Sequence, residues 1–283
     1  MPGCQHTQVH AVQRVSVCVA LAALLGGAGA SAAGVQQGLD PARQLYNQGH
    51  YEQAIDAARR LKTAATADAA NLLVARSCLE LFRETTDRTT LATARESLGD
   101  IKPARLTDGD RLDYLVGLGE ALYLDDQFGP AARLFESVLG RGDELGPQRF
   151  DRVFDWWATS LDRQAQSGAA GNREHLYEAI RRQAVSSLGT MPGSSAAAYW
   201  LAAAYRYLGD LTAAWDAAVA AWVRAPMADD QGRALRADID QLVLQAILPE
   251  RVRQMASGEA ERERVTAVLL ASWNAVKKDW PNR

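Results

Sequence analysis

The stretch from Leu115 to Leu139, LVGLGEALYLDDQFGPAARLFESVL, places two amphipathic helical patterns directly next to each other. In its first half, apolar or small residues recur at i, i+3, i+4 and i+7, which is one face of a helix. The sequence Asp125-Asp126-Gln127 interrupts this pattern, and a second helical pattern begins at Phe128. Pro130 falls in the first turn of the second helix, where a missing N–H costs little. The stretch therefore predicts two short helices folded against each other across a tight turn.

The spacing of small residues in this stretch recurs elsewhere in the chain. Gly119 on the first helix and Ala131 on the second are separated by 131 − 119 = 12 residues, and we expect them to let the two helices approach closely. The same interval occurs as 54 − 42 around Gly49 and as 214 − 202 around Gly209. Gly49 stands where the first helix ends, as suits a residue that is free to adopt a positive φ.

This unit resembles a tetratricopeptide repeat, a helix–turn–helix motif with a period of about 34 residues. The units at residues 115–139 and 195–226 match the family well, the unit that begins near residue 42 matches fairly, and two units between them are looser. The resemblance implies an all-α fold, an α-solenoid of about five such repeats over residues 33–226. Residues 227–283 are expected to form a C-terminal helical cap.

Three further segments carry specific structural expectations. Ala165–Asn172, AQSGAAGN, has the composition of a flexible loop that could cover a pocket. Asp229–Leu248 predicts a longer helix that Pro249 interrupts. The final helix is predicted over Glu259–Lys278, and the residues expected on its inner side are Val265, Val268, Leu269, Ser272, Trp273 and Val276.

Residues 1–32 have the pattern of an export signal. Arg14 precedes the apolar run Val15–Leu25, and small residues follow it, so cleavage is expected after Ala30 or Ala32. The alternative, an uncleaved anchor, is less favoured because the apolar run is too short to span a bilayer comfortably. We therefore expect a periplasmic or secreted protein whose mature chain has no transmembrane segment. Cys78 would be its only cysteine, and its helical surroundings predict a buried core residue.

The sequence contains no recognisable catalytic or metal-binding motif. His50 and His175 are the only histidines after residue 32, and both are expected at the surface. The acidic pairs Asp125-Asp126 and Asp229-Asp230 fall at predicted helix boundaries, where acids complement the dipole of the following helix. The formal net charge of −3 gives no electrostatic reason to expect nucleic-acid binding. We therefore expect no enzyme activity, no cofactor and no metal.

In the tetratricopeptide family, the first helix of each repeat lines a concave groove that takes an extended peptide or a partner helix. Tyrosine and arginine are the residue types that dominate interface energetics, and both occur in this frame. The frame mixes positive and negative charges, which argues against a groove built for a single acidic tail. The resemblance implies that the groove-facing residues are Arg43, Tyr46, Asn47, Asp113, Glu120, Tyr123, Arg152, Asp155, Tyr199, Arg206 and Tyr207, with Val116, Asp162 and Arg163 in the same frame.

Two functions from different classes follow from these patterns. The first is a non-catalytic interaction scaffold that binds a protein or peptide partner in the groove. The alternative is an exported helical-repeat protein that binds a small molecule, in the groove or under the segment 165–172, in association with solute transport. A closed, aromatic-lined concavity favours the small molecule, whereas an open groove favours a protein partner.

Overall fold

Residues 38–168, 170–228 and 230–281 are described by the computed structural model, and all of their regular secondary structure is helical. The expectation of an all-α fold is confirmed. The α-helices are α2 (Asp40–Asn47), α3 (Tyr51–Arg60), α4 (Ala67–Thr85), α5 (Arg88–Gly99), α6 (Asp108–Leu124), α7 (Phe128–Leu139), α8 (Pro147–Ser167), α9 (Ala170–Thr190), α10 (Ser195–Tyr207), α11 (Leu211–Arg224), α12 (Arg233–Leu242), α13 (Leu248–Met255) and α14 (Glu259–Asp279).

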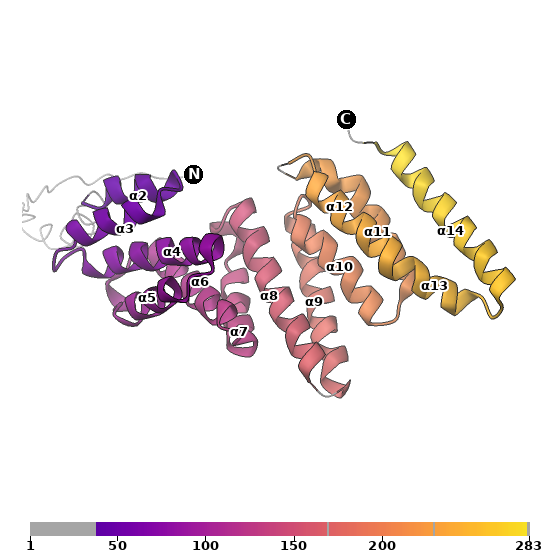
Figure 1. Ribbon diagram of the computed structural model, residues 1–283, viewed down its shortest axis with the longest axis horizontal. Helices are drawn as coiled ribbons and strands as arrows, with labels where there is room; N and C mark the ends of the chain where they lie inside the picture. Colours follow the sequence, from indigo (N-terminus) through magenta and orange to yellow (C-terminus); the bar gives the residue numbers. More distant parts are fainter. Residues whose placement is uncertain (1–37, 169, 229, 282–283) are drawn as a thin grey trace, which may run out of the picture.

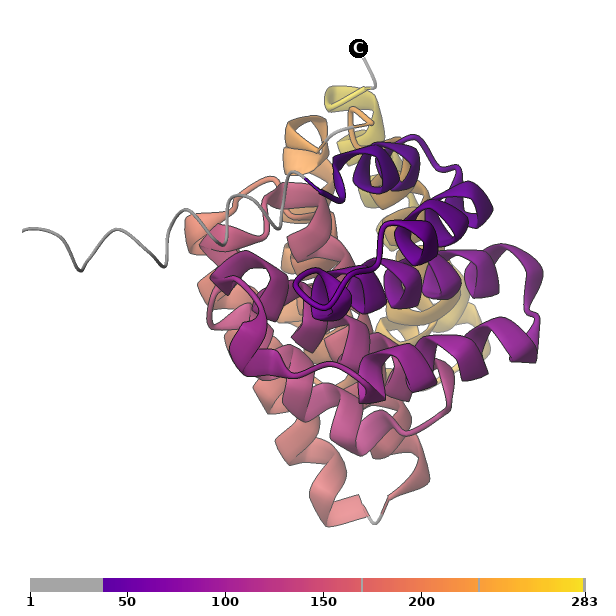
Figure 2. The same ribbon diagram turned by 90° about the vertical axis from the view of Figure 1, so that its left-hand side faces the viewer.

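The helices pack in neighbouring pairs, and each pair also contacts the next pair along the chain. In Figure 1 they follow one another from α2 at one end of the molecule to α14 at the other, and Figure 2 looks along this row from its N-terminal end. The even-numbered helices α2 to α12 also contact one another in succession. Among the helices described, the odd-numbered ones from α3 to α11 make no comparable contacts with each other. The even-numbered helices therefore form the inner layer, and the odd-numbered ones lie apart on the outer side.

The turn between paired helices has the same backbone geometry in three units. Gly49, Asp126 and Gly209 adopt left-handed φ angles of 78°, 58° and 82°. In each turn, the amide of the next residue donates to the carbonyl five residues earlier, at 2.8 to 3.1 Å. This bond pattern is that of a Schellman motif, which satisfies carbonyls at the end of a helix. The prediction that Gly49 ends the first helix with a positive φ is confirmed, and Asp126 adopts the same conformation in the 115–139 unit.

The small residues that the spacing singled out are buried in all three units, as Ala42 and Ala54, Gly119 and Ala131, and Ala202 and Ala214. Gly119 shows why small residues are needed here. A Cβ built on Gly119 would lie 2.6 Å from Cε1 of Phe135, a ring on α7 that is fully buried. The predicted close approach of the two helices is therefore confirmed, and no larger residue fits at this position unless the Phe135 ring is displaced.

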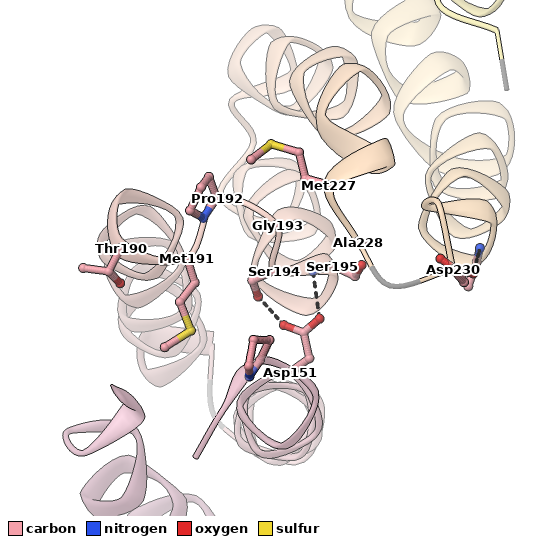
Figure 3. Close-up of a pocket in the computed structure, with 12 residues that line it drawn as sticks. Asp151, Thr190, Met191, Pro192, Gly193, Ser194, Ser195, Met227, Ala228 and Asp230 are labelled. Carbon is pink, nitrogen blue, oxygen red and sulfur yellow. Dashed lines mark hydrogen bonds between the residues drawn. The ribbon is translucent and has the colours of Figure 1, made fainter. Parts of the chain in front are cut away.

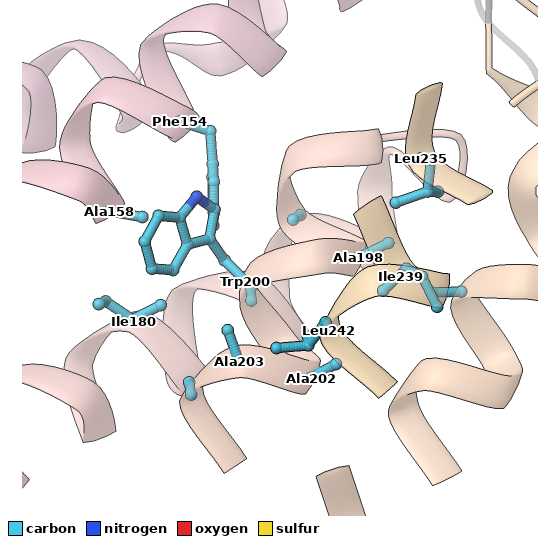
Figure 4. Close-up of a cluster of buried hydrophobic side chains, with 14 of the residues drawn as sticks. Phe154, Ala158, Ile180, Ala198, Trp200, Ala202, Ala203, Leu235, Ile239 and Leu242 are labelled. Carbon is cyan, nitrogen blue, oxygen red and sulfur yellow. The ribbon is translucent and has the colours of Figure 1, made fainter. Parts of the chain in front are cut away.

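Two hydrophobic cores meet at α6, one extending back to α2 and the other forward to α14. Figure 4 shows part of the second core, where the indole of Trp200 on α10 lies against Phe154 of α8 and Ile180 of α9. The alanines of α10 leave room on their other side for Leu235 and Ile239 of α12. Large residues therefore fill the gaps opposite small ones, as the alanine-rich sequence of this unit predicts. Cys78 is buried in the first core, as expected.

The C-terminal helix α14 is anchored by tryptophan contacts. Trp273 is fully buried, packs edge-on against Trp215 and Trp222 of α11, and donates from Nε1 to Asp240 of α12 at 2.7 Å. The expectation that Val268 faces inward is wrong, because 68% of this residue is exposed. The inward stripe is therefore narrower than the sequence pattern indicated, and Leu269 and Trp273 are its buried members.

Two predicted interruptions of helical structure are also wrong. The segment 165–172 is not a long loop, because α8 continues to Ser167 and α9 begins at Ala170. The helix predicted from residue 229 begins at Arg233, and Asp229 lies outside the described residues.

Pro249 does not interrupt the helical path of the chain between α12 and α13. A π-helical turn over Val243–Ile247 leads directly into α13, and Pro249 lies in the first turn of α13, where its missing N–H is tolerated.

The close approach at Gly119 makes a specific prediction. Gly119→Ala should destabilise the protein by about 1 to 3 kcal/mol, because the added methyl group overlaps the ring of Phe135, although alanine is the better helix former. Gly117→Ala on the same helix is the matched control, because its Cβ would lie 3.4 Å from the nearest atom, an ordinary contact. Urea unfolding followed by circular dichroism measures both variants. Equal stability of the two variants would contradict the packing described here.

Candidate ligand groove

A cavity of about 340 Å³ opens on the inner layer, between helices α2, α4, α6 and α8. Six of the residues predicted to face the groove line it, namely Tyr46, Asn47, Asp113, Val116, Glu120 and Arg152. The sequence reasoning missed other members of the lining. These are Tyr51, Arg76, Glu80, Val153, Trp156, Gln148 and Arg149, together with Gly117. The predicted residues of helices α2, α6 and α8 thus meet in one place.

Helical periodicity explains why these side chains converge. On α4, Arg76, Glu80 and Arg83 follow each other at i, i+4 and i+7. On α6 the same interval separates Asp113, Gly117 and Glu120, and on α8 it separates Arg149, Val153 and Trp156. Residues with this spacing share one face of a helix, so each helix presents a single row to the cavity. The rows of α4 and α8 could have been found by applying this spacing to the two looser units.

Each of two carboxylates in the groove is shared by two arginines. Asp113 of α6 accepts hydrogen bonds from Arg76 of α4 and Arg149 of α8. Glu80 of α4 forms ion pairs with Arg83 on its own helix and with Arg152 of α8, the latter at 3.2 Å between Oε1 and Nη1. These ion pairs tie three inner helices together.

Tyr46 connects the ion pairs of Glu80 with those of Asp113, because it bonds both Glu80 and Arg76. The Tyr46 hydroxyl donates to Oε1 of Glu80 at 3.2 Å and accepts from Nη2 of Arg76 at 3.4 Å. The Arg76 guanidinium also lies over the Tyr46 ring, 4.6 Å from its centroid. A cation over an aromatic ring is attracted by the ring's negative face, so α2 holds Arg76 in place by two kinds of contact.

The charged groups of this network differ in exposure according to sign. The side chains of Asp113, Glu80 and Glu120 are 13%, 16% and 8% exposed. The side chains of Arg149 and Arg152 are 40% and 53% exposed. A ligand that enters the groove therefore meets guanidinium groups first, with the carboxylates behind them.

Glu120 lies at the buried side of the groove. Its Oε1 lies 3.0 Å from Nη1 of Arg83, but this oxygen has no hydrogen bond of good geometry within the described residues. Burial raises the pKa of Glu120 to about 7, and this effect outweighs the attraction of Arg83, Arg152 and Arg76 for the charged form. The groove thus contains a carboxyl group that titrates close to neutral pH.

Trp156 forms the aromatic wall of the groove. Its side chain is buried, as is that of its neighbour Trp157. Its ring packs against Phe135 and Tyr123, with centroids 5.6 and 6.2 Å apart, and the Arg83 guanidinium lies 5.4 Å from its centroid. The wall is therefore packed against two other rings and contacts one of the arginines.

The remaining residues predicted to face the groove do not line this cavity. Arg43 bonds Asp110 at 3.2 Å, and Tyr123 packs edge-on against Phe128. Further along the inner layer, the other four residues contact neighbouring side chains. Asp155 accepts a hydrogen bond from Trp200, and Tyr199 packs edge-on against the same tryptophan. Arg206 bonds Glu250, and Tyr207 stacks on Tyr177 with ring centroids 4.2 Å apart. The cavity therefore takes in only the N-terminal part of the predicted groove.

A second cavity, of about 520 Å³, lies outside this groove at the loop between α9 and α10. Figure 3 shows it between Met191 and Met227, with Asp151 pointing toward Ser194 and Ser195. The Asp151 carboxylate accepts from the Ser194 hydroxyl and, at 2.9 Å, from the Ser195 amide. Asp230 likewise accepts from the amides of Gly232 and Ala234. Because both acids bond the starts of helices, we rank this cavity below the groove as a candidate site.

Comparison with known proteins identifies no relative: no protein-family model, no curated protein sequence and no solved structure matches this chain significantly. Within the described ranges, no helix has the length and apolar character needed to cross a membrane. Over the same residues, no three side chains of His, Cys, Asp or Glu are grouped so that they could hold a metal ion. His50 and His175 are both exposed, as expected.

The raised pKa of Glu120 predicts how stability depends on pH. Between about pH 4.5, the usual pKa of glutamate, and about pH 7, the folded protein binds more protons at this site than the unfolded chain. The free energy of unfolding should therefore fall as the pH rises through this window. Relative to Glu120→Gln, which does not titrate, wild type should lose up to about 3 kcal/mol.

Urea titrations of wild type and E120Q at pH 5, 6, 7 and 8 measure this difference. Glu136→Gln, at an exposed position on α7, controls for the loss of one negative charge. A constant difference between wild type and E120Q over the whole range would show that Glu120 ionises normally in the folded protein.

Proposed function

We propose that this protein is a non-catalytic scaffold of the tetratricopeptide type that binds a peptide or protein partner in the groove on its inner layer. Two features of the described chain support a repeat architecture. The turn geometry and the spacing of buried small residues recur in three units. The succession of contacts among even-numbered helices gives the inner and outer layers that an α-solenoid requires. In this proposal, α12 to α14 form the C-terminal cap, and α14 covers the apolar surface of α11 and α12.

The observation that carries the binding function is the convergence of three helical rows on one cavity. These rows combine exposed arginines with aromatic side chains, the composition typical of binding hot spots. At its edge, Asn47 and Gln148 supply exposed amide groups that can bond the backbone of an extended peptide. A cavity of 340 Å³ holds one or two side chains of a partner, and the rest of the partner would extend along the inner helices.

We further propose that the protein acts outside the cytoplasm, in the periplasm or as a secreted protein. The support is the sequence pattern of residues 1–32, which lie outside the described residues. A partner should accordingly be sought in the envelope fraction of the host.

Site-specific photo-crosslinking tests the proposed groove. A photoreactive amino acid at Asn47, on the inner layer, should capture one or a few envelope proteins, because this exposed position borders the cavity. The same amino acid at Glu136, exposed on the outer helix α7, is the matched control and should capture none of them. Mass spectrometry of the crosslinked peptides identifies the partner and its contact.

The same protein captured equally from both positions would contradict a groove on the inner layer. Complete absence of capture at Asn47 by folded protein would argue for the small-molecule alternative, for which ligand screening by thermal shift is the corresponding measurement.

A further inference from the structure

We infer that the groove between α4, α6 and α8 receives the carboxylate of an acidic side chain, so that the partner segment is an acidic peptide. This inference rests on the proposed function and specifies the chemistry of its ligand. Three observations support it: the groove has more arginines than carboxylates, its most exposed charges are positive, and two of its arginines are three residues apart on α8.

The positive charges of the groove exceed the negative charges that neutralise them. The four guanidinium groups of Arg76, Arg83, Arg149 and Arg152 are paired with the two carboxylates of Asp113 and Glu80. Each carboxylate carries one negative charge, so sharing leaves two positive charges uncompensated. The third carboxylate, Glu120, pairs with Arg83 from a buried position where its charged form is disfavoured. An added anion would reduce this excess of positive charge.

The uncompensated charge lies on the side of the groove that faces solvent. Arg149 and Arg152 are the most exposed members of the network, and they are three residues apart on α8. Side chains at i and i+3 on a helix are neighbours, so both guanidinium groups can reach one ligand group. The planar fork of a guanidinium matches the two oxygens of a carboxylate. The pair therefore suits a carboxylate rather than an ammonium group, which this cluster would repel.

The surroundings of the arginines favour a peptide over a free small anion. Tyr51 and Trp156 provide apolar surface beside the charged groups, and Asn47 and Gln148 provide amides at the edge. An inorganic anion uses none of these groups, whereas a peptide presents backbone amides and apolar side chains next to its carboxylate. The predicted groove frame has mixed charge and so did not favour an acidic ligand, but that frame lacks Arg76, Arg83 and Arg149.

Selection from a peptide library tests this inference. A randomised octapeptide library with acetylated N-termini and amidated C-termini is displayed and captured on the purified full-length protein. We expect enrichment of Asp or Glu at one or two positions. The affinity of a selected peptide, measured by isothermal titration calorimetry, should fall about tenfold or more when those residues are replaced by Asn or Gln.

Paired variants connect the selection to the groove. Arg149→Gln with Arg152→Gln should abolish the acidic enrichment and reduce the affinity of the selected peptide about tenfold or more. Arg133→Gln with Arg182→Gln, at exposed positions on α7 and α9, removes the same charge elsewhere and should leave both unchanged. Circular dichroism confirms that each pair of substitutions preserves the helical fold.

Three outcomes would overturn the inference. The first is selection of peptides without acidic residues, which leaves the peptide-binding groove in place but assigns it another ligand. The second is acidic enrichment that persists in the Arg149 and Arg152 variant. The third is binding of inorganic phosphate or glutarate that is as tight as binding of the peptide. Failure of the crosslinking at Asn47 together with an empty selection would instead contradict the proposed function itself.

Discussion

The close approach of paired helices is the constraint on which the rest of the structure depends. At Gly119 the backbone of α6 meets the ring of Phe135 so closely that a Cβ would lie 2.6 Å from it. Buried alanines occupy the matching positions in the first and fifth units. Pairs joined in this way by tight turns must stack on their neighbours to bury their remaining apolar faces. The stacking brings the even-numbered helices into contact with one another, so polar residues far apart in the chain share one inner surface.

The groove follows from this stacking and from charge burial. Residues of α4, α6 and α8 that are 36 to 72 positions apart in sequence form its ion pairs. The carboxylates of Asp113 and Glu80 lie deep, where each is held by two guanidinium groups, and this arrangement limits the cost of removing them from water. The arginines remain partly exposed because their long side chains reach toward solvent. An inner surface built in this way is rigid at its base and positively charged at its opening.

Local features of the fold could be predicted from the sequence, whereas long-range pairings could not. The periodicity of Leu115–Leu139 predicted both helices, the turn and the close contact at Gly119, because each of these features depends on residues that are close together in the sequence. The segment 165–172 misled because its alanines and glutamine favour helix as readily as its glycines favour a loop. Six groove residues were predicted from the frame of the first helices. Helical spacing alone could have placed Arg76, Glu80 and Arg149 on the faces of α4 and α8 that line the groove, but not their ion pairs, which join helices far apart in the sequence.

The measurement that tests the account most directly is NMR of the arginine side chains, which reports each guanidinium group separately. Without ligand, the Nε–Hε signals of Arg76 and Arg83 should be protected from exchange with water, and those of Arg149 and Arg152 should exchange faster. Addition of an acidic peptide selected for binding should shift and protect the signals of Arg149 and Arg152. Signals that do not respond to a bound peptide, or shifts confined to arginines of α9 and α11, would contradict the assignment of the groove as the binding site.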